Sequence, residues 1–288
     1  MNVTKGITIC ALVVELICSF TEVARSQQAS PVQPPAQVMI TESSQDSAPG
    51  PPESDVAKAN NPIAPMNAIY FQNYYAPTLY GVPGPNNLLD IRSILISGRQ
   101  IIRATLPILG SDFGNGDQVS GLGDFNVFDA FRVSREKSRN VLAVGPLVVA
   151  PTATNRFLGQ GKWQAGLAGV GVHSLSEGSL LIGILTWQHA FAGEHSRPVA
   201  QDVTFQPIAT LSVGRGYYVR SSGTWSFDIS DHKNLIPVGI GFGKVFKSGN
   251  VIVNAFVEPQ FTVYHDGTAL PSIQLYSGLY FLFQKKTD

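Results

Sequence analysis

Histidines and one glycine-rich stretch are the residues of this chain that could support catalysis or phosphate binding. Gly159-Gln160-Gly161-Lys162 resembles the end of a phosphate-binding loop, but Arg156 stands where the first glycine belongs, and Trp163 replaces the serine or threonine. No H-E-x-x-H pair and no G-x-S-x-G motif occurs in the sequence. The histidines are His173, His189, His195, His232 and His265. We therefore predict that the protein is not an enzyme and carries no cofactor and no metal.

A second group of polar side chains alternates with apolar side chains along the sequence. In Val251 to Tyr264, every odd-numbered position is apolar, whereas most even-numbered positions are polar. Because successive side chains of a strand point to opposite faces, this segment is a long strand with one apolar and one mostly wet face. The same parity places further polar residues on the wet faces of other strands. The predicted lumen-lining residues are Arg103, Arg220, Asp228, Asn254, Glu258 and Gln260.

Charges on these faces have two interpretations. Charged side chains inside a pore set its selectivity through their local field. Opposite charges can equally cross-link the inside of a small barrel and leave little or no aqueous channel. The formal net charge is zero, so long-range electrostatics does not decide between pore lining and internal ion pairing.

The composition indicates that the elements carrying these residues lie in a bilayer. Charged residues make up 14% of the chain, compared with about 25% in soluble domains. After residue 26 no apolar run reaches the length that a spanning helix needs, so a closed barrel is the remaining way to cross. With no net charge, the chain offers no electrostatic surface for nucleic acid. We predict lipid as its main partner.

Segments with period-two alternation begin near residue 67 and predict an all-β, antiparallel, up-and-down transmembrane barrel of about twelve strands. Short gaps such as 98–100, 214–216 and 247–249 alternate with long gaps such as 110–122 and 152–161. Outer-membrane barrels have short periplasmic turns and longer extracellular loops. The predicted strands are 67–76, 88–97, 101–109, 123–133, 140–151, 162–173, 179–191, 201–213, 217–228, 236–246, 250–264 and 271–283.

The N-terminus indicates export. Lys5, an apolar stretch and Ala24-Arg25-Ser26 predict a cleavable signal peptide at 1–26. Residues 27–62 are rich in Pro, Ser and Gln and predict a disordered periplasmic segment. The barrel is then assigned to 63–284 and a C-terminal tail to 285–288. Both cysteines lie in the signal peptide, so the mature chain forms no disulfide.

The last strand resembles the C-terminal signal that outer-membrane barrels present to their insertion machinery. The residues that carry this resemblance are Tyr276, Gly278, Phe281 and Phe283. It implies the insertion machinery as a second partner. Residues 284–288 follow the terminal phenylalanine, and this extension departs from the common pattern.

Two further stretches resemble a bacterial family named for the MetA pathway of phenol degradation, some members of which are mislabelled neuromedin U. They are Gly121-Leu122-Gly123-Asp124-Phe125 and the segment 145–163, with its P-T-A-T and L-G-x-G-K-W elements. The resemblance implies a transporter in the outer membrane of a Gram-negative bacterium, but supplies no ligand residues.

From these observations we expect a passive outer-membrane channel for small, apolar or aromatic molecules, with the solute left open. A closed structural or surface-interaction barrel is the alternative, and a membrane hydrolase a third.

Overall fold

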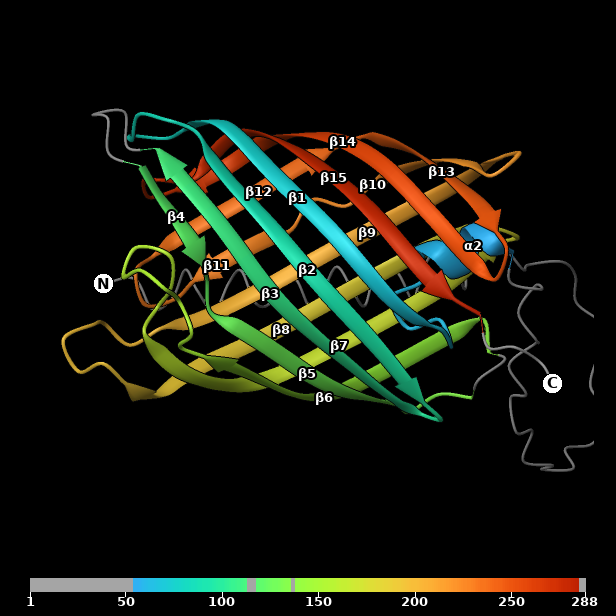
Figure 1. The fold of residues 1–288 in the computed structure, drawn as a ribbon, viewed down its shortest axis with the longest axis horizontal. Helices are drawn as coiled ribbons and strands as arrows, with labels where there is room; N and C mark the ends of the chain where they lie inside the picture. The colour runs from blue at the N-terminus through green and yellow to red at the C-terminus, as the bar shows by residue number, and fades with distance from the viewer. Residues whose placement is uncertain (1–53, 113–117, 136–137, 285–288) are drawn as a thin grey trace, which may run out of the picture. The chain divides into compact units, whose positions relative to one another are not determined.

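A computed structural model of the chain describes residues 54–112, 118–135 and 138–284, which form an all-β barrel with a short helix inside it (Figure 1). The predicted signal peptide, most of the predicted disordered segment and the C-terminal tail lie outside these residues. Across the described ranges, no helix is both long enough and apolar enough to cross a membrane. The elements are α2 (Asp55–Asn60), β1 (Asn67–Leu79), β2 (Asn86–Ser97), β3 (Gln100–Asp112), β4 (Gln118–Leu122), β5 (Phe125–Arg132), β6 (Asn140–Ala150), β7 (Lys162–Ser176), β8 (Ser179–Gly193), β9 (Gln201–Gly214), β10 (Tyr217–Ser221), β11 (Trp225–Asp228), β12 (Lys233–Gly239), β13 (Gly241–Ser248), β14 (Val251–Asp266) and β15 (Pro271–Phe283).

The fifteen strands of the described residues occupy twelve positions around a closed antiparallel barrel, as the sequence predicted. We call each of these positions a stave, whether one strand or two short strands fill it. Three staves are interrupted: β4 and β5 both pair with β3, β10 and β11 with β9, and β12 and β13 with β14. The register of β12 against β14 shifts between Ile236 and Pro237, where proline has no N–H to give to the ladder. Closure comes from β1, which pairs with β15 from Asn67 opposite Phe283 onward.

The two faces of the barrel wall differ as the alternation predicted. In β14, Val257, Phe261 and Val263 are exposed on the outside, whereas Glu258 and Gln260 are buried on the inside. Large apolar side chains are exposed over the outer surface on most staves. A soluble monomer rarely exposes apolar patches of this extent, whereas the outer band of a membrane barrel consists of them. The exterior is therefore suited to lipid.

Connections alternate in length along the chain. At one end the strands are joined by tight turns at 98–99, 177–178, 215–216 and 249–250. Gly98 and Gly249 adopt positive φ angles of 59° each in these turns, a conformation that glycine adopts without a steric penalty. Most of the connections at the other end are longer, as in outer-membrane barrels, where that end is extracellular.

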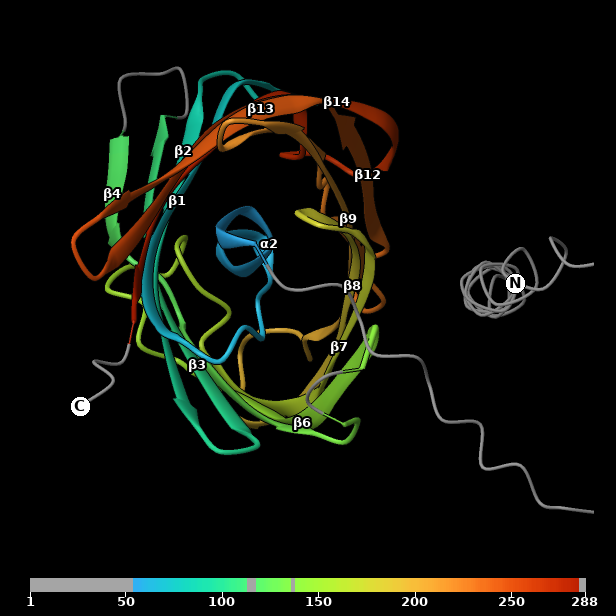
Figure 2. The ribbon, with the colours of Figure 1, turned by 90° about the vertical axis from the view of Figure 1, so that its right-hand side faces the viewer.

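Helix α2 lies inside the barrel at the end with the tight turns (Figures 1 and 2). Ser54 caps the helix, because its hydroxyl accepts a 3.2 Å hydrogen bond from the backbone N–H of Ala57. Val56, Ala59 and Ile63 are buried and belong to the same apolar cluster as inward side chains of the wall. That inner wall is apolar on three neighbouring staves: Ala143 and Leu147 on β6, Ala168, Val170 and Val172 on β7, and Leu180, Ile182 and Ile184 on β8.

The prediction of disorder is wrong for residues 54–62, which form α2 and the turn after it. Composition suggested disorder because the segment has too few large apolar residues to bury a core of its own. The barrel wall supplies that core instead. The wall itself begins at Asn67 and not at residue 63.

Glycines in the wall make room for large inward rings. Tyr218 of β10 is fully buried, and it lies opposite Gly243 of β13. A Cβ atom at Gly243 would lie 2.3 Å from Cζ of the Tyr218 ring. The absence of a side chain at Gly243 therefore lets the ring lie against the wall.

We expect Gly243→Ala to lower the free energy of unfolding by about 1–3 kcal/mol, the usual cost of overpacking. The new methyl group displaces Tyr218 and breaks the 2.6 Å hydrogen bond from its hydroxyl to Oδ1 of Asn254. Urea unfolding of the refolded barrel measures the change. Gly169→Ala is the matched control, because a Cβ there meets nothing within 4 Å; an equal loss in both variants would contradict the packing argument.

Candidate functional site

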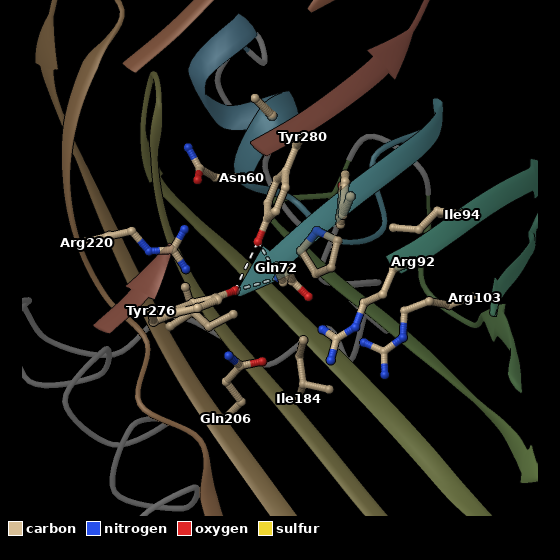
Figure 3. Close-up of a pocket in the computed structure, with 14 residues that line it drawn as sticks. Asn60, Gln72, Arg92, Ile94, Arg103, Ile184, Gln206, Arg220, Tyr276 and Tyr280 are labelled. Carbon is tan, nitrogen blue, oxygen red and sulfur yellow. Dashed lines mark hydrogen bonds between the residues drawn. The ribbon is translucent and has the colours of Figure 1, made fainter. Parts of the chain in front are cut away.

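A small cavity of about 40 Å³ lies inside the barrel beside α2 (Figure 3). Asn60 of α2 and inward side chains of β1, β2, β3, β8, β9, β10 and β15 line it. The polar lining residues are Asn60, Gln72, Arg92, Arg103, Gln206, Arg220, Tyr276 and Tyr280. Ile94, Ile184 and Ile208 give the same cavity an apolar part. The mixed lining identifies this cavity as the candidate site.

Tyrosines from both sides of the closing seam form one cluster around Gln72. The amide nitrogen of Gln72 in β1 donates to the hydroxyl of Tyr276 at 2.5 Å and to that of Tyr280. The ring of Tyr70 stacks on Tyr280 with centroids 3.8 Å apart, and Tyr74 stacks on Tyr276 at 4.3 Å. These residues alternate along β1 and β15, so antiparallel pairing brings them face to face. The cluster forms the seam side of the cavity.

A buried ion pair lies next to this cluster. Nε of Arg220 is 2.9 Å from Oε2 of Glu258, which is completely buried. The backbone N–H and hydroxyl of Ser222 also donate to Glu258, at 2.7 and 2.6 Å, and Gln260 donates at 2.8 Å. The guanidinium of Arg220 lies 3.6 Å from the ring centroid of Phe256. Because both charges are compensated by neighbours, the desolvation cost of burying them is offset.

Two more arginines lie on the other side of the cavity, on β2 and β3. Arg92 donates to Asp90 at 2.7 Å. Arg103 lies over the ring of Phe128, 4.1 Å from its centroid. Within the described residues, Nε of each arginine is buried without a hydrogen-bond partner. Each of these two guanidinium groups therefore has an N–H donor that no described residue accepts.

Asn254 joins the wall to α2. Its amide nitrogen donates to the backbone oxygen of Ala59 at 3.1 Å and to the side chain of Asn60 at 3.3 Å. A second connection follows the helix, where Arg132 donates to the backbone oxygen of Ile63 at 2.9 Å. These hydrogen bonds fix the position of α2 in the lumen.

The structure places most of the predicted lumen-lining residues near one another. Arg220, Asn254, Glu258 and Gln260 are buried on the inner face, and Arg103 lines the same cavity from β3. Asp228 is set apart, because its carboxylate accepts the backbone N–H groups of Ser230 and Asp231, at 2.9 and 2.8 Å, in an exposed turn. Internal ion pairing therefore describes Arg220 and Glu258, and it does not describe Arg103.

The four residues of the predicted insertion signal divide between the two faces of β15. Phe283 is exposed on the outside, and Phe281 packs edge-on against Phe71. Tyr276 is buried in the lumen, and Gly278 makes room there for Phe256, whose ring carbons would lie 2.3 Å from a Cβ at that position. The role of these residues in insertion stays a prediction.

Sequence reasoning missed the site residues of β1 and β2. Tyr70, Gln72 and Tyr74 share the inner face of β1, whereas Ile69 and Phe71 are on the outer face. Because both faces carry aromatic rings, hydropathy alternation does not separate them. The stacking of tyrosines across the seam becomes visible only when β1 is paired with β15.

The stretches that carry the family resemblance form an ordered loop at the extracellular end. The carboxylate of Asp124 accepts the backbone N–H groups of Ala153 and Gln160, at 3.1 and 2.6 Å. The backbone oxygen of Gly159 accepts a 2.6 Å hydrogen bond from Arg197, which also pairs with Glu194. The glycines and Asp124 therefore shape a loop, and no phosphate needs to be bound to explain them.

No protein-family model and no curated protein matches the sequence. Among solved structures, the chain is similar to the COG4313 outer membrane channel from Pseudomonas putida F1, with a TM-score of 0.50 and 14% identity over 76% of this chain and 94% of that one. It is also similar to the KdgM porin in complex with disordered oligogalacturonate, with a TM-score of 0.46 and 9% identity over 75% and 99% of the two chains. The prediction of a bacterial outer-membrane barrel is confirmed at the level of the fold. Membership of the family named for the MetA pathway stays a prediction.

We expect Glu258→Gln to lower the free energy of unfolding by about 3–5 kcal/mol, because it leaves the buried charge of Arg220 without its carboxylate. Urea unfolding measures the loss. Removing both partners in Arg220→Gln/Glu258→Gln should restore part of it, and Glu177→Gln in an exposed turn should cost little. A single variant as stable as the wild type would show that the pair is not structurally important.

We expect Asp124→Ala to release the loop at 151–161. Two backbone N–H groups lose their acceptor, at a cost of about 1–3 kcal/mol if they stay unpaired. Hydrogen exchange should accelerate at Ala153 and Gln160. Asp266→Ala, which removes an exposed carboxylate from the same end of the barrel, should leave these amides protected; equal exchange in both variants would refute the role of Asp124.

Proposed function

We propose that this protein is a passive channel of the bacterial outer membrane for small molecules with an apolar or aromatic part, and that α2 restricts its width. The exterior would contact outer-membrane lipid, and the last strand would be recognised by the insertion machinery. The structurally similar protein from Pseudomonas putida F1 is described as an outer membrane channel. That description supports the proposal, although at 14% identity the similarity itself concerns the fold.

The observation that carries the proposal is the unmet hydrogen-bonding capacity around the cavity. Within the described residues, Oε1 of Gln72 and Nε of Arg92 and Arg103 are buried without a partner. In a dry, closed barrel each such group would cost about 1–3 kcal/mol. In a lumen that admits water and solutes, these groups find partners there. A route for polar contents therefore accounts for the lining better than a sealed core does.

The apolar part of the lining bears on the solute. Ile94, Ile184 and Ile208 face the cavity together with the ring of Tyr280. Pockets that combine apolar walls with a few polar groups fit small organic molecules. Support for an apolar or aromatic solute comes from this combination.

A closed structural or surface-interaction barrel is the second candidate. Helix α2 in the lumen and the Arg220–Glu258 pair favour it, because both fill the interior. The extracellular loop at 151–161, ordered by Asp124, would then be the contact surface.

We expect the purified full chain to give discrete conductance steps in planar bilayers, and Asn254→Ala to raise the time-averaged conductance. The substitution removes two hydrogen bonds to α2; at about 1 kcal/mol each, their loss shifts the equilibrium between seated and displaced α2 about tenfold or more. Asn250→Ala, in an exposed turn next to the same strand, is the control and should behave like the wild type.

Absence of conductance steps and of solute flux into liposomes, for the wild type and for Asn254→Ala alike, would rule out the channel and leave the closed barrel. A conductance that is insensitive to Asn254→Ala would retain the channel and reject the role of α2.

A further inference from the structure

We propose that the cavity contains a binding subsite for a small organic anion, whose carboxylate is held by Arg103 and Arg92 and whose apolar body lies against the tyrosine and isoleucine side chains. The subsite deepens the proposed function, on which it rests, by naming the chemical class of the solute.

Arg103 differs from the other two arginines of the cavity, because no carboxylate in the described part of the chain pairs with it. Arg220 pairs with Glu258, and Arg92 pairs with Asp90. Among the described residues, the guanidinium of Arg103 makes neither an ion pair nor a hydrogen bond, and its contact is the face of Phe128. A guanidinium has five N–H donors in a planar fork that matches a carboxylate. Arg103 therefore has the donors for a bidentate bond and no acceptor for them among the described residues.

The charge balance around the cavity points to the same class of ligand. Each of the carboxylates next to its arginines, Asp90 and Glu258, is already paired. Among the described residues no carboxylate forms an ion pair with Arg103, which lies in the interior of a barrel, where unpaired charge is costly. An anionic group of a solute would compensate it, and charge-assisted hydrogen bonds of this kind are stronger than neutral ones.

Arg92 is placed to share the same anion. It lies opposite Thr105 in the pairing of β2 with β3, and Arg103 lies opposite Ile94, so the two arginines are diagonal neighbours on the inner face. Their guanidinium groups lie side by side in Figure 3, away from Arg220. Nε of Arg92 is still without a partner among the described residues, because the bond to Asp90 uses a different nitrogen.

The remaining walls suit an apolar body attached to that carboxylate. Ile94 follows Arg92 on the inner face, and Ile184 lies below the arginines in Figure 3. The ring of Tyr280 faces the same space from the seam. Contact with these side chains removes apolar surface from water, which stabilises binding of an aromatic carboxylate relative to a bare carboxylate.

Calorimetric titration of the full-length protein in detergent tests the subsite with benzoate as the probe. Benzyl alcohol keeps the ring and lacks the charge, and acetate keeps the carboxylate and lacks the ring. The variants are Arg103→Gln, Arg103→Lys and the control Arg215→Gln, which removes one positive charge from an exposed turn. Heat-dependent mobility in gels identifies the folded barrel in every preparation.

We expect benzoate to bind the wild type and Arg215→Gln equally. It should bind Arg103→Gln at least about tenfold more weakly, because this change in affinity corresponds to the loss of one charge-assisted hydrogen bond. Arg103→Lys should fall between them, since it keeps the charge without the fork. Acetate and benzyl alcohol should bind more weakly than benzoate, and benzyl alcohol should be indifferent to Arg103→Gln.

The proposal is overturned if Arg103→Gln and Arg215→Gln bind benzoate equally, or if acetate binds the wild type as tightly as benzoate does. Because binding is measured without a membrane, its outcome is independent of conductance. A protein that binds benzoate and never conducts would retain the subsite and refute the channel, whereas one that conducts without binding benzoate would do the reverse.

Discussion

The pairing of β1 with β15 is the contact on which the rest of the structure depends. In a bilayer no water is available to satisfy the backbone groups of a sheet edge, so a sheet that crosses it has to close on itself. Here the first and last staves meet from Asn67 opposite Phe283 onward. Closure fixes the size of the lumen and brings the stacked tyrosines of the two strands together. The seam thus completes the membrane barrel and builds one wall of the candidate site.

A closed barrel of this size leaves an interior that the inward side chains fill unevenly. The staves β6, β7 and β8 present apolar side chains inward, and α2 completes the packing against this part of the wall. The opposite part carries the Arg220–Glu258 pair and the tyrosine cluster. The cavity lies between these regions and takes its mixed lining from both. The position of α2 and the composition of the site therefore have the same cause, which is the unequal distribution of apolar side chains around the lumen.

The sequence predicts the barrel well because lipid outside and a polar lumen inside impose period two on several strands, although β6, β7 and β8 carry apolar side chains inward as well. The faces of β14 follow from parity alone. The alternation does not predict which strands pair with each other. Gln72 and Tyr276, for example, come into contact only because β1 pairs with β15 when the barrel closes. Helix α2 escaped prediction for a related reason, since its apolar partners, such as Leu180, belong to the wall and are far away in sequence. Asp228 has the right parity, but it stands at the strand end, where a turn uses its carboxylate.

Helix α2 has six residues, well below the length of about 12–15 at which an isolated helix is even marginally stable in water. Its structure therefore depends on the wall, on buried side chains such as Val56 and on the hydrogen bonds from Asn254 and Arg132. The backbone ladder of the barrel, by contrast, closes without any contribution from α2. A change in the position of α2 can consequently alter the width of the lumen without unfolding the wall. In the proposed channel, this separation would let the barrel supply stability while the position of α2 and the charges around the cavity govern passage.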